Sequence, residues 1–391
     1  MKGFKENTEW IFWTTITITF VLLEHNGTEP LFLIAYSLIP LLVLIFYYKR
    51  SFWTIAIYLL FFGVLGRYTR YFRGVYSSDV LPTINDFIGY FIHGKNVYES
   101  LVAAHTGIIP FVYLPFTLYW YLPARILNID FRFYEMLVSL FVPILFFLIP
   151  FIMNKTLPAG RQEWKILPIL SVISLTPFLL DLSADGSNDN SAIFLLLSSI
   201  VFLAWSIKKK NGRLAFLSAV FLGFAISFKQ YSFFYLLFFI PFLFKKKGFL
   251  PINFRKYFFT TFITFFLISL PFIFSSPLGF FKNIFYAEVA NQVNHPIWGW
   301  NIWLALKYLF GFIPSIQLLW VVRTTAVLST IFVIFKYFKI DKFNKVFIAS
   351  GITILVYLIF SSWTTHAYFT FLIPLLALGA FELEGGKNSA G

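Results

Sequence analysis

Long apolar segments separated by short polar ones follow one another along the whole chain. Twelve of these segments are apolar enough to enter a lipid bilayer, although several are shorter than the roughly 20 residues that a straight helical span needs. They are Trp10–Leu23, Leu31–Tyr48, Phe52–Gly66, Phe133–Met153, Ile166–Leu182, Ser191–Ile207, Leu214–Phe228, Tyr231–Phe244, Tyr257–Phe274, Ser315–Phe335, Phe347–Phe360 and Ala367–Leu383. The pattern predicts an all-α, polytopic membrane protein of about 12 transmembrane helices.

Lysine and arginine residues gather in short loops on one side of these predicted spans. The clusters are Lys49-Arg50, Lys208 to Lys210, Lys245 to Lys247, Arg255-Lys256 and the run from Lys336 to Lys345. Because cytoplasmic loops carry an excess of positive charge, we expect this side to face the cytoplasm. The sequence therefore predicts a multi-pass plasma-membrane protein with both termini in the cytoplasm.

One further apolar segment, His105 to Leu127, does not fit this count. If it crossed the bilayer, the basic loop from Asn154 to Lys165 would move to the outer side. Three prolines within the segment, Pro110, Pro115 and Pro123, interrupt the continuity of a helix. We therefore expect a re-entrant or juxtamembrane element here.

Composition narrows the class of protein further. Hydrophobic residues make up 59% of the 391 residues and charged residues only 12%, which excludes a soluble globular fold. The net charge of +14 comes mainly from the loop clusters, so it reports topology and gives no reason to expect a nucleic-acid partner. The chain has no cysteine, which excludes thiolate metal sites and cysteine nucleophiles. No repeat or linker divides the sequence, so residues 1–391 are expected to form one integral-membrane domain.

The predicted topology places a large loop, residues 67–104, on the outer side. Within it, apolar residues recur at helical spacing at Ile84, Phe87, Ile88, Phe91 and Ile92. This spacing predicts an amphipathic helix over residues 82–93 that lies on the membrane surface. Asp86 falls on the polar face, where the helix dipole also favours a first-turn carboxylate, and Asp79 directly precedes the helix.

A second acidic element, SADGSNDNSAIF, begins at Ser183. Asp185 and Asp189 are four residues apart and would share a face if the next helix began early. Structural capping is the simplest role here, with Ser187 or Asn188 as the cap and Asp189 in the first turn of that helix. Alternatively, the two carboxylates position a substrate or a divalent cation, and carboxylate oxygens would favour Mg²⁺ or Mn²⁺.

Two cations stand close to or within the predicted spans. Lys229 lies between two short apolar segments, where its ammonium group either reaches the membrane interface or binds an anionic head group. Arg323 lies about a third of the way into a span. An intramembrane arginine usually faces a bundle interior or a cavity, and a guanidinium group is well suited to phosphate.

Aromatic and histidine residues gather in the later outer loops. The segment NQVNHPIWGWNIW contains His295, Trp298, Trp300 and Trp303. Anchoring at the membrane interface is the simplest role of these indoles, and stacking against the apolar face of a sugar would use the same residues. His366 opens the last span, where a structural hydrogen bond is the simplest role.

These elements together resemble the integral-membrane glycosyltransferases of the GT-C fold, most closely the branch that uses polyprenyl-phosphate mannose. The residues that carry the resemblance are Asp79, the helix through Tyr90, Gly94 to Tyr98, Tyr113-Leu114-Pro115, Gly186 to Asp189, Lys229, and Tyr368 to Pro374. Val80 and Val97 depart from the family pattern, in which a Phe follows the Asp and a Pro precedes the Tyr. The order and spacing of the elements, from about residue 66 to residue 379, carry the resemblance.

The resemblance implies inverting transfer of a sugar, mannose or a similar hexose, from a polyprenyl- or dolichyl-phosphate donor on the non-cytoplasmic face. Asp79 would be the general base, while Lys229 and Arg323 would stabilise the donor phosphate. The secondary acidic candidates are Asp86, Asp185 and Asp189, and the substrate-binding candidates are Tyr98, His295, Trp298 and His366. The acceptor would be a glycan, a lipid or a protein, and the protein would also contact membrane lipid. If a Mg²⁺ or Mn²⁺ ion is used, Asp79 and Asp189 would hold it.

Three alternative functions stay open. A secondary transporter usually has internal repeats and acidic residues near the middle of the membrane, and neither is seen in the sequence. A polysaccharide polymerase or ligase would rely on arginines of the outer loop, and Arg67, Arg70 and Arg73 keep that alternative open. A flippase or an assembly scaffold for lipid-linked sugars is the third. The sequence contains no phosphate-binding loop, dinucleotide-binding turn, zinc-protease motif or serine-hydrolase motif.

Overall fold

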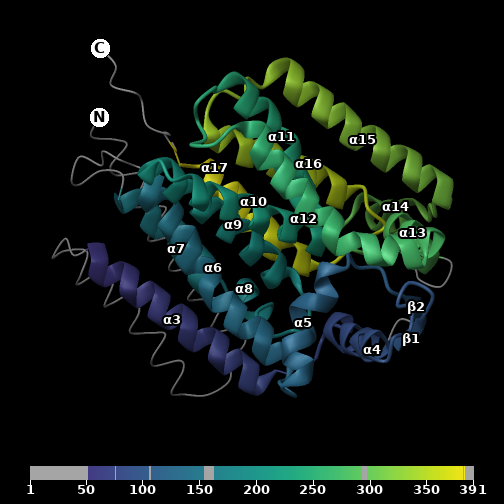
Figure 1. Ribbon diagram of the computed structural model, residues 1–391. Helices are drawn as coiled ribbons and strands as arrows, with labels where there is room; N and C mark the ends of the chain where they lie inside the picture. Colours follow the sequence, from purple (N-terminus) through teal and green to yellow (C-terminus); the bar gives the residue numbers. More distant parts are fainter. Residues whose placement is uncertain are drawn as a thin grey trace, which may run out of the picture.

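The chain forms a bundle of helices in a computed structural model that describes residues 52–74, 76–104, 107–153, 163–292, 297–381 and 383 (Figure 1). The helices of the first half are α3 (Phe52–Arg73), α4 (Val80–Ile92), α5 (Phe116–Ile126), α6 (Phe131–Met153), α7 (Glu163–Leu175), α8 (Pro177–Asp181) and α9 (Asp189–Lys209). The remaining helices are α10 (Gly212–Phe228), α11 (Tyr231–Lys245), α12 (Phe254–Ser275), α13 (Pro277–Gln292), α14 (Ile302–Phe310), α15 (Ile316–Tyr337), α16 (Phe343–Ile359), the short 3₁₀ helix η1 (His366–Tyr368) and α17 (Phe369–Gly379). The strands are β1 (Leu101–Ala104), β2 (Gly107–Pro110), β3 (Trp298–Gly299) and β4 (Trp363–Thr364).

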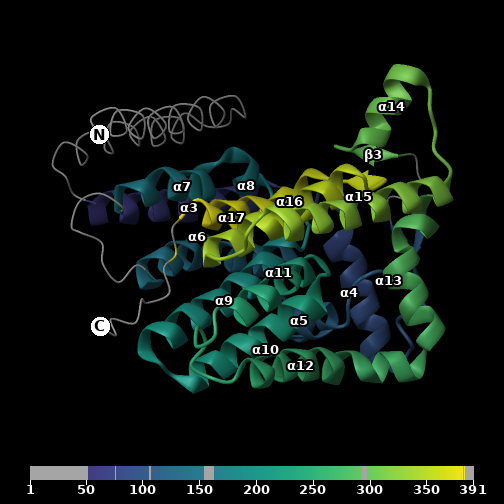
Figure 2. The same cartoon turned by 90° about the horizontal axis from the view of Figure 1, so that it is seen from above.

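The two ends of the bundle differ in character. Figure 2 shows α4, α13 and α14 at one end, which we call the α4 end. Short turns at Lys210-Asn211 and Lys229-Gln230 make α9, α10 and α11 run antiparallel. Exposed lysines at 208–210 and 245–247 therefore lie at the opposite end, which we call the lysine end. The predicted sorting of basic loops away from acidic loops is seen in these helices.

The described helices are those of a polytopic membrane protein. Five are long and apolar enough to cross a bilayer: Phe52–Phe72, Phe131–Met153, Asp189–Lys209, Phe254–Ser275 and Ile316–Tyr337. Shorter apolar helices, including α10, α11 and α16, pack among them. The predicted spans Trp10–Leu23 and Leu31–Tyr48 lie outside the described residues, and the number of about 12 spans stays a prediction.

The outward faces of α12 and α15 are apolar. Exposed side chains include Phe259 and Leu267 on α12, and Leu328 and Phe332 on α15. Contiguous apolar surface of this kind on a membrane protein is surface for lipid. Both helices therefore lie at the periphery of the bundle.

The described part of the segment His105 to Leu127, residues 107–127, enters the bundle from the α4 end. Its helix α5 has 11 residues, about 16 Å at 1.5 Å per residue, which is too short to cross a bilayer. The Thr117 hydroxyl donates to the Phe228 carbonyl at 3.3 Å, and the Trp120 indole donates to Ser191 Oγ at 2.7 Å. These bonds satisfy polar groups of α5 inside the bundle.

The helix expected at 82–93 is α4, but its apolar face does not rest on lipid. Ile84, Phe87 and Ile88 are completely buried in the protein core, and Ile92 alone of the predicted stripe is exposed. The face is covered because α4 packs on α5 and β1. Gly94, at φ +71°, ends the helix with its amide bonded to the Phe91 carbonyl.

Two small sheets correct the all-α expectation. Strands β1 and β2 form an antiparallel hairpin after α4, with Val102 paired to Ile109. Strands β3 and β4 are parallel and pair Trp298 with Trp363 and Gly299 with Thr364. The second pairing joins segments far apart in sequence, so the local apolar pattern did not reveal it.

The predicted span Ile166–Leu182 is broken into α7 and α8 because Pro177 cannot continue the helix. The break leaves carbonyl groups at the end of α7 without helical partners. Arg67, which is 3% exposed within α3, donates to the carbonyls of Ile173 and Ser174 at 3.0 and 2.9 Å. This arginine therefore ties two helices together.

Candidate active site

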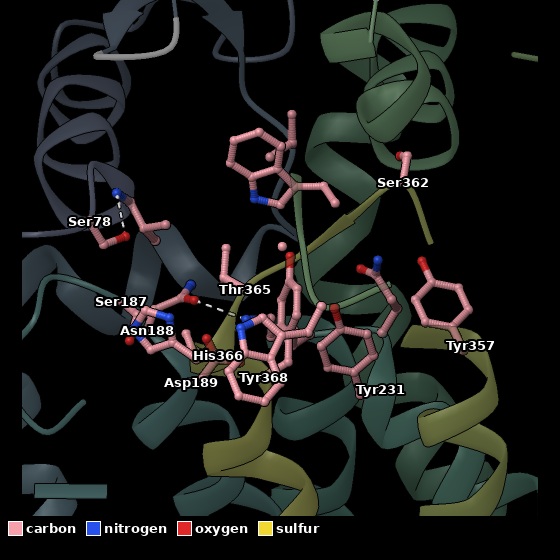
Figure 3. Close-up of a pocket in the computed structure, with 18 of the residues that line it drawn as sticks. Ser78, Ser187, Asn188, Asp189, Tyr231, Tyr357, Ser362, Thr365, His366 and Tyr368 are labelled. Carbon is pink, nitrogen blue, oxygen red and sulfur yellow. Dashed lines mark hydrogen bonds and ion pairs between the residues drawn. The ribbon is translucent and has the colours of Figure 1, made fainter. Parts of the chain in front are cut away.

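A cavity of about 1040 Å³ lies at the α4 end of the bundle (Figure 3). Its walls come from the α3–α4 loop, the start of α9, the α10–α11 turn, α15, α16 and the segment from β4 to η1. The cavity brings together six of the candidate residues: Asp79, Asp185, Asp189, Lys229, Arg323 and His366. Their positions in sequence span most of the described chain, so the fold assembles them.

Asp79 stands at the N-cap position of α4, in a loop that docks on the second acidic loop. The amides of Ser77 and Ser78 both donate to the Asp185 carbonyl at 2.9 Å, and the Leu81 amide donates to the Gly186 carbonyl at 2.9 Å. The Asp79 carbonyl accepts from the Thr83 amide at 3.0 Å, as the first turn of the helix requires. Backbone bonds therefore fix where Asp79 stands relative to the 185–189 loop.

Gly186 makes this docking possible. Its φ of +100° lies in the left-handed region, which favours glycine. A Cβ atom at this position would lie 2.6 Å from the Ser78 carbonyl oxygen and 2.8 Å from the Tyr76 ring. Any side chain at position 186 would push the two acidic loops apart.

A polar cluster holds the chain just before Asp79. The Asp130 carboxylate accepts from Tyr76 OH at 2.9 Å and pairs with Arg132 Nη2 at 3.0 Å. Arg132 also donates to the Gly74 carbonyl and stacks on the Tyr76 ring at 4.5 Å. Burial raises the pKa of Asp130, but the bonds from Arg132 and Tyr76 outweigh it, so the pKa lies below its ordinary value. The cluster keeps a charged carboxylate at the base of the loop.

Asp185 is buried in the cavity wall and bonds within its own loop. Its Oδ1 atom accepts from the Ser187 amide at 2.8 Å and from the Ser187 hydroxyl at 2.7 Å. Burial nevertheless raises the pKa of the Asp185 carboxyl from 3.8 to about 6, because loss of water disfavours the charged form more than these bonds favour it. Asp185 therefore titrates near neutral pH at the edge of the cavity.

Asp189 and Lys229 form a buried ion pair across the start of α9 and the α10–α11 turn. Lys229 Nζ lies 2.6 Å from Asp189 Oδ1 and donates to Asn188 Oδ1 at 3.2 Å. The ammonium group also lies 5.5 Å from the Tyr231 ring centre and 5.2 Å from the Tyr368 ring centre. Lys229 is thus held inside the cavity and does not extend to the membrane interface.

Arg323 lines the cavity from α15. Its side chain is 8% exposed, so the cavity and the protein cover it although most of α15 faces outward. The guanidinium carbon lies 4.6 Å from the Trp320 ring centre and 4.9 Å from the Tyr357 ring centre. Nη1 approaches Ser361 Oγ at 3.5 Å. These two aromatic rings help to orient the guanidinium group.

Glu135 is a buried acidic residue that the sequence interpretation missed. It lies in α6, is 1% exposed, and accepts from the Ser191 amide at 3.2 Å and from the hydroxyls of Ser191 and Tyr121. The bond to the Ser191 amide satisfies a free donor in the first turn of α9. A lone Glu inside an apolar segment is itself a signal of function or of a buried network, and that signal was available.

The sequence interpretation did not assign three tyrosines around the two cations to the site, although Tyr368 belongs to one of the motifs that carry the resemblance. Tyr231, Tyr357 and Tyr368 line the cavity, and Figure 3 shows Tyr368 beside His366 and Asp189, with Tyr357 farther away. Tyr231 follows Lys229 by two residues, which was a usable local signal. Tyr357 and Tyr368 come from distant helices, so sequence spacing could not place them.

Four predicted residues are not placed in the cavity by the structure. Asp86 is exposed on the outer face of α4, and Tyr98 is 3% exposed and donates to the Tyr113 carbonyl at 2.8 Å. Tyr98 therefore supports the wall that carries Tyr113, and its contact with substrate stays a prediction. His295 lies outside the described residues, and Trp298 is described only by its backbone in β3.

The described residues of the cavity do not present the ligand set of a metal site. No group of three His, Cys, Asp or Glu side chains within the described ranges is arranged to hold a metal ion. Asp189, one of the two predicted ligands, has its Oδ1 atom engaged by Lys229. The described residues of this site therefore do not fit the Mg²⁺ or Mn²⁺ ion that was considered as a hypothesis from the sequence.

Comparison with known proteins gives one distant similarity. No known protein-family model matches the chain. A stretch of 192 residues is 27% identical to GPI mannosyltransferase 1 of Candida albicans, and the match covers 46% of this chain and 43% of that relative. The chain thus spans less than half the length of this relative.

Proposed function

We propose that this protein is a membrane glycosyltransferase that moves a hexose, mannose in the first instance, from a polyprenyl- or dolichyl-phosphate carrier to an acceptor hydroxyl with inversion. The observation that carries the proposal is a single cavity that joins Asp79 to Lys229 and Arg323. A carboxylate and cations in one cavity match the two charges that develop during transfer, on the acceptor and on the leaving phosphate. The distant similarity to a mannosyltransferase supports the same class of reaction.

In the proposed reaction, Asp79 accepts the proton of the acceptor hydroxyl. The acceptor oxygen forms a bond to the anomeric carbon as the bond from that carbon to the phosphate oxygen breaks. The products are the glycosylated acceptor and the free lipid phosphate, and the proton on Asp79 passes to water. Because one displacement occurs, the anomeric configuration inverts. General-base assistance of this kind contributes about 10²- to 10⁴-fold in rate.

Arg323 is the better candidate for direct contact with the donor phosphate. Lys229 is already ion-paired with Asp189 at 2.6 Å, so that carboxylate offsets part of its charge. Arg323 stands on α15, next to cavity-lining residues Val327 and Leu328, and Leu328 is also exposed on the outward face. A phosphate attached to a lipid chain can reach this side of the cavity from the bilayer. Lys229 then holds Asn188 and Asp189 in the cavity wall and adds positive potential to the site.

The membrane orientation belongs to the same proposal. The exposed lysines lie at the end of the bundle opposite the cavity, and positive residues favour the cytoplasmic side. The cavity would therefore face the non-cytoplasmic side, where lipid-phosphate sugars serve as donors without a nucleotide. No step is assigned to a metal ion, because the carboxylates do not form a fitting ligand set.

The arginines that would favour a polymerase or ligase have other tasks. Arg67 holds the end of α7, and Arg70 pairs with Asp181 at 3.1 Å. Neither lines the cavity, and the side chain of Arg73 is not described. We therefore do not carry that alternative forward.

The experiment is transfer by the purified chain in phospholipid vesicles that contain radiolabelled polyprenyl-phosphate mannose. The acceptor probe is octyl α-mannoside, a sugar hydroxyl on a short alkyl chain. We expect labelled octyl dimannoside and an equal amount of free polyprenyl phosphate. If the donor stays intact, while soluble sugar accumulates inside the vesicles, the protein is a carrier and the proposal fails.

A further inference from the structure

Trp300 is exposed at the cavity, in contrast to the nearby Trp303. Trp300 lines the cavity with its side chain 71% exposed, the highest fraction among the tryptophans whose side chains the structure describes. Trp303, three residues later, is 4% exposed and donates its indole NH to the Phe360 carbonyl at 2.9 Å. Exposing a whole indole is unfavourable unless something covers the ring in the working protein.

The backbone holds Trp300 in this position. Its amide donates to the Thr364 carbonyl at 2.8 Å, directly after the parallel pairing of Gly299 with Thr364. The two chains are so close that a Cβ atom on Gly299 would lie 1.8 Å from the Thr364 oxygen. Asn301 reinforces the junction by donating to the Ser362 carbonyl at 3.2 Å. A tryptophan without a role at the cavity would not need a backbone fixed by these contacts.

Polar groups that suit hydroxyls stand on the same wall. Ser362, Thr365 and His366 flank β4, and all three line the cavity with Trp300. An aromatic face beside a few oriented polar groups is the usual composition of a small-molecule site. A sugar ring presents the complementary chemistry, with an apolar face of C–H groups and an edge of hydroxyls.

We propose that Trp300, with Thr365 and His366, forms the subsite for a sugar ring of the acceptor, so that the acceptor is a glycan or glycolipid. This inference rests on the proposed function and names the substrate class for one wall of its site. The donor phosphate belongs to the Arg323 wall, which leaves the β3–β4 wall for the acceptor. A tryptophan that served only as a membrane anchor would be expected on an outward surface, without a role in acceptor binding.

The kinetic test compares Trp300→Ala and Trp300→Phe with Trp53→Ala. Trp53 is a matched control, because it is 52% exposed on α3 and does not line the cavity. With octyl α-mannoside as acceptor, Trp300→Ala should raise the acceptor KM about tenfold, as loss of one aromatic contact implies, with the donor KM unchanged. Trp300→Phe should raise the acceptor KM less than Trp300→Ala does, because a smaller aromatic ring remains. Trp53→Ala should leave the acceptor KM unchanged. Octanol, which lacks a sugar ring, should be a poor acceptor for every variant.

An unchanged acceptor KM in Trp300→Ala would overturn the inference, as would equal use of octanol. Equal loss of donor and acceptor binding, together with poor recovery in membranes, would show an interfacial anchor and would also overturn it. A second measurement does not need transfer: mannobiose should quench tryptophan fluorescence of the wild type and not of Trp300→Phe. If quenching depends on Trp300 but no sugar is transferred, the proposed reaction fails and the sugar subsite stands.

Discussion

A Cβ atom on Gly186 would lie 2.6 Å from the Ser78 carbonyl oxygen, so the loop that carries Asp79 and the loop that carries Asp185 touch through a glycine. The contact is backbone to backbone, with the amides of Ser77 and Ser78 both bonded to the Asp185 carbonyl. Three carboxylates enter one cavity because these two loops are fixed to each other. The close approach is therefore a condition for the site.

Replacing Gly186 with alanine should separate the loops and abolish most transfer. The variant combines a strained φ of +100° with a collision, and strain of this kind is worth about 1–3 kcal/mol. Gly94→Ala is the matched control, since Gly94 also has a positive φ, +71°, but nothing lies within 4 Å of a Cβ there. Thermal unfolding in detergent and transfer rates measure both effects. Equal behaviour of the two variants would contradict the importance of the docking.

Breaking the pair between Asp189 and Lys229 should destabilise the protein strongly. Removing one partner leaves a buried charge without compensation, which costs about 3–5 kcal/mol. Asp189→Asn and Lys229→Met should each lower the unfolding midpoint, and the double variant should lose less than the sum of the two. The pair Asp341 and Lys345 has the same 2.6 Å separation but lies at the surface, so Asp341→Asn is the control and should change little. If the losses of stability caused by Asp189→Asn and Lys229→Met are additive in the double variant, the two groups do not interact.

The raised pKa of Asp185 predicts that its contribution to stability falls as the pH rises. Its folded-state pKa of about 6 lies above the ordinary 3.8, so the folded protein binds more protons than the unfolded chain between these values. The contribution of Asp185 to stability is fully present below about pH 4 and is lost as the pH rises through 6, about 3 kcal/mol in total. Asp185→Asn should remove this part of the curve of unfolding free energy against pH. An unchanged curve would mean that Asp185 is not buried in the protonated form.

Arg323 should determine affinity for the donor. Arg323→Met removes charge-assisted hydrogen bonds to phosphate, and we expect a rise in donor KM of about ten- to a hundredfold. Arg323→Lys should recover only part of the loss, because an ammonium group cannot bind phosphate through two parallel bonds. Arg125→Met is the control, since Arg125 is exposed and bonds to Asn85 away from the cavity. A donor KM that is unchanged in Arg323→Met would remove the residue from the phosphate site.

Much of the architecture could be predicted from the sequence because apolar segments report helices directly. The ordering of loops also followed, since lysines sort to one end and Asp79, Asp189 and Lys229 to the other. The helix at 82–93 was found by its spacing, but spacing does not tell whether protein or lipid covers an apolar face. Ile84 and Phe87 are buried under α5 and β1, which only the tertiary fold decides.

The rest of the site depends on contacts between distant segments. The parallel pairing of Trp298 with Trp363 places Trp300 at the cavity, and no local pattern encodes a two-residue strand. Tyr357 reaches Arg323 from another helix for the same reason. Glu135 is different, because a single Glu inside an apolar segment can be recognised in the sequence. Its position there predicts a buried partner.

The most direct measurement is sugar transfer by Asp79→Asn beside Asp86→Asn, with radiolabelled polyprenyl-phosphate mannose in vesicles and octyl α-mannoside as acceptor. Asp79 lines the cavity, whereas Asp86 is exposed on the same helix and does not. We predict that Asp79→Asn lowers the transfer rate about 10²- to 10⁴-fold with unfolding temperature preserved, and that Asp86→Asn transfers like the wild type. Transfer retained by Asp79→Asn would contradict its assignment as the general base.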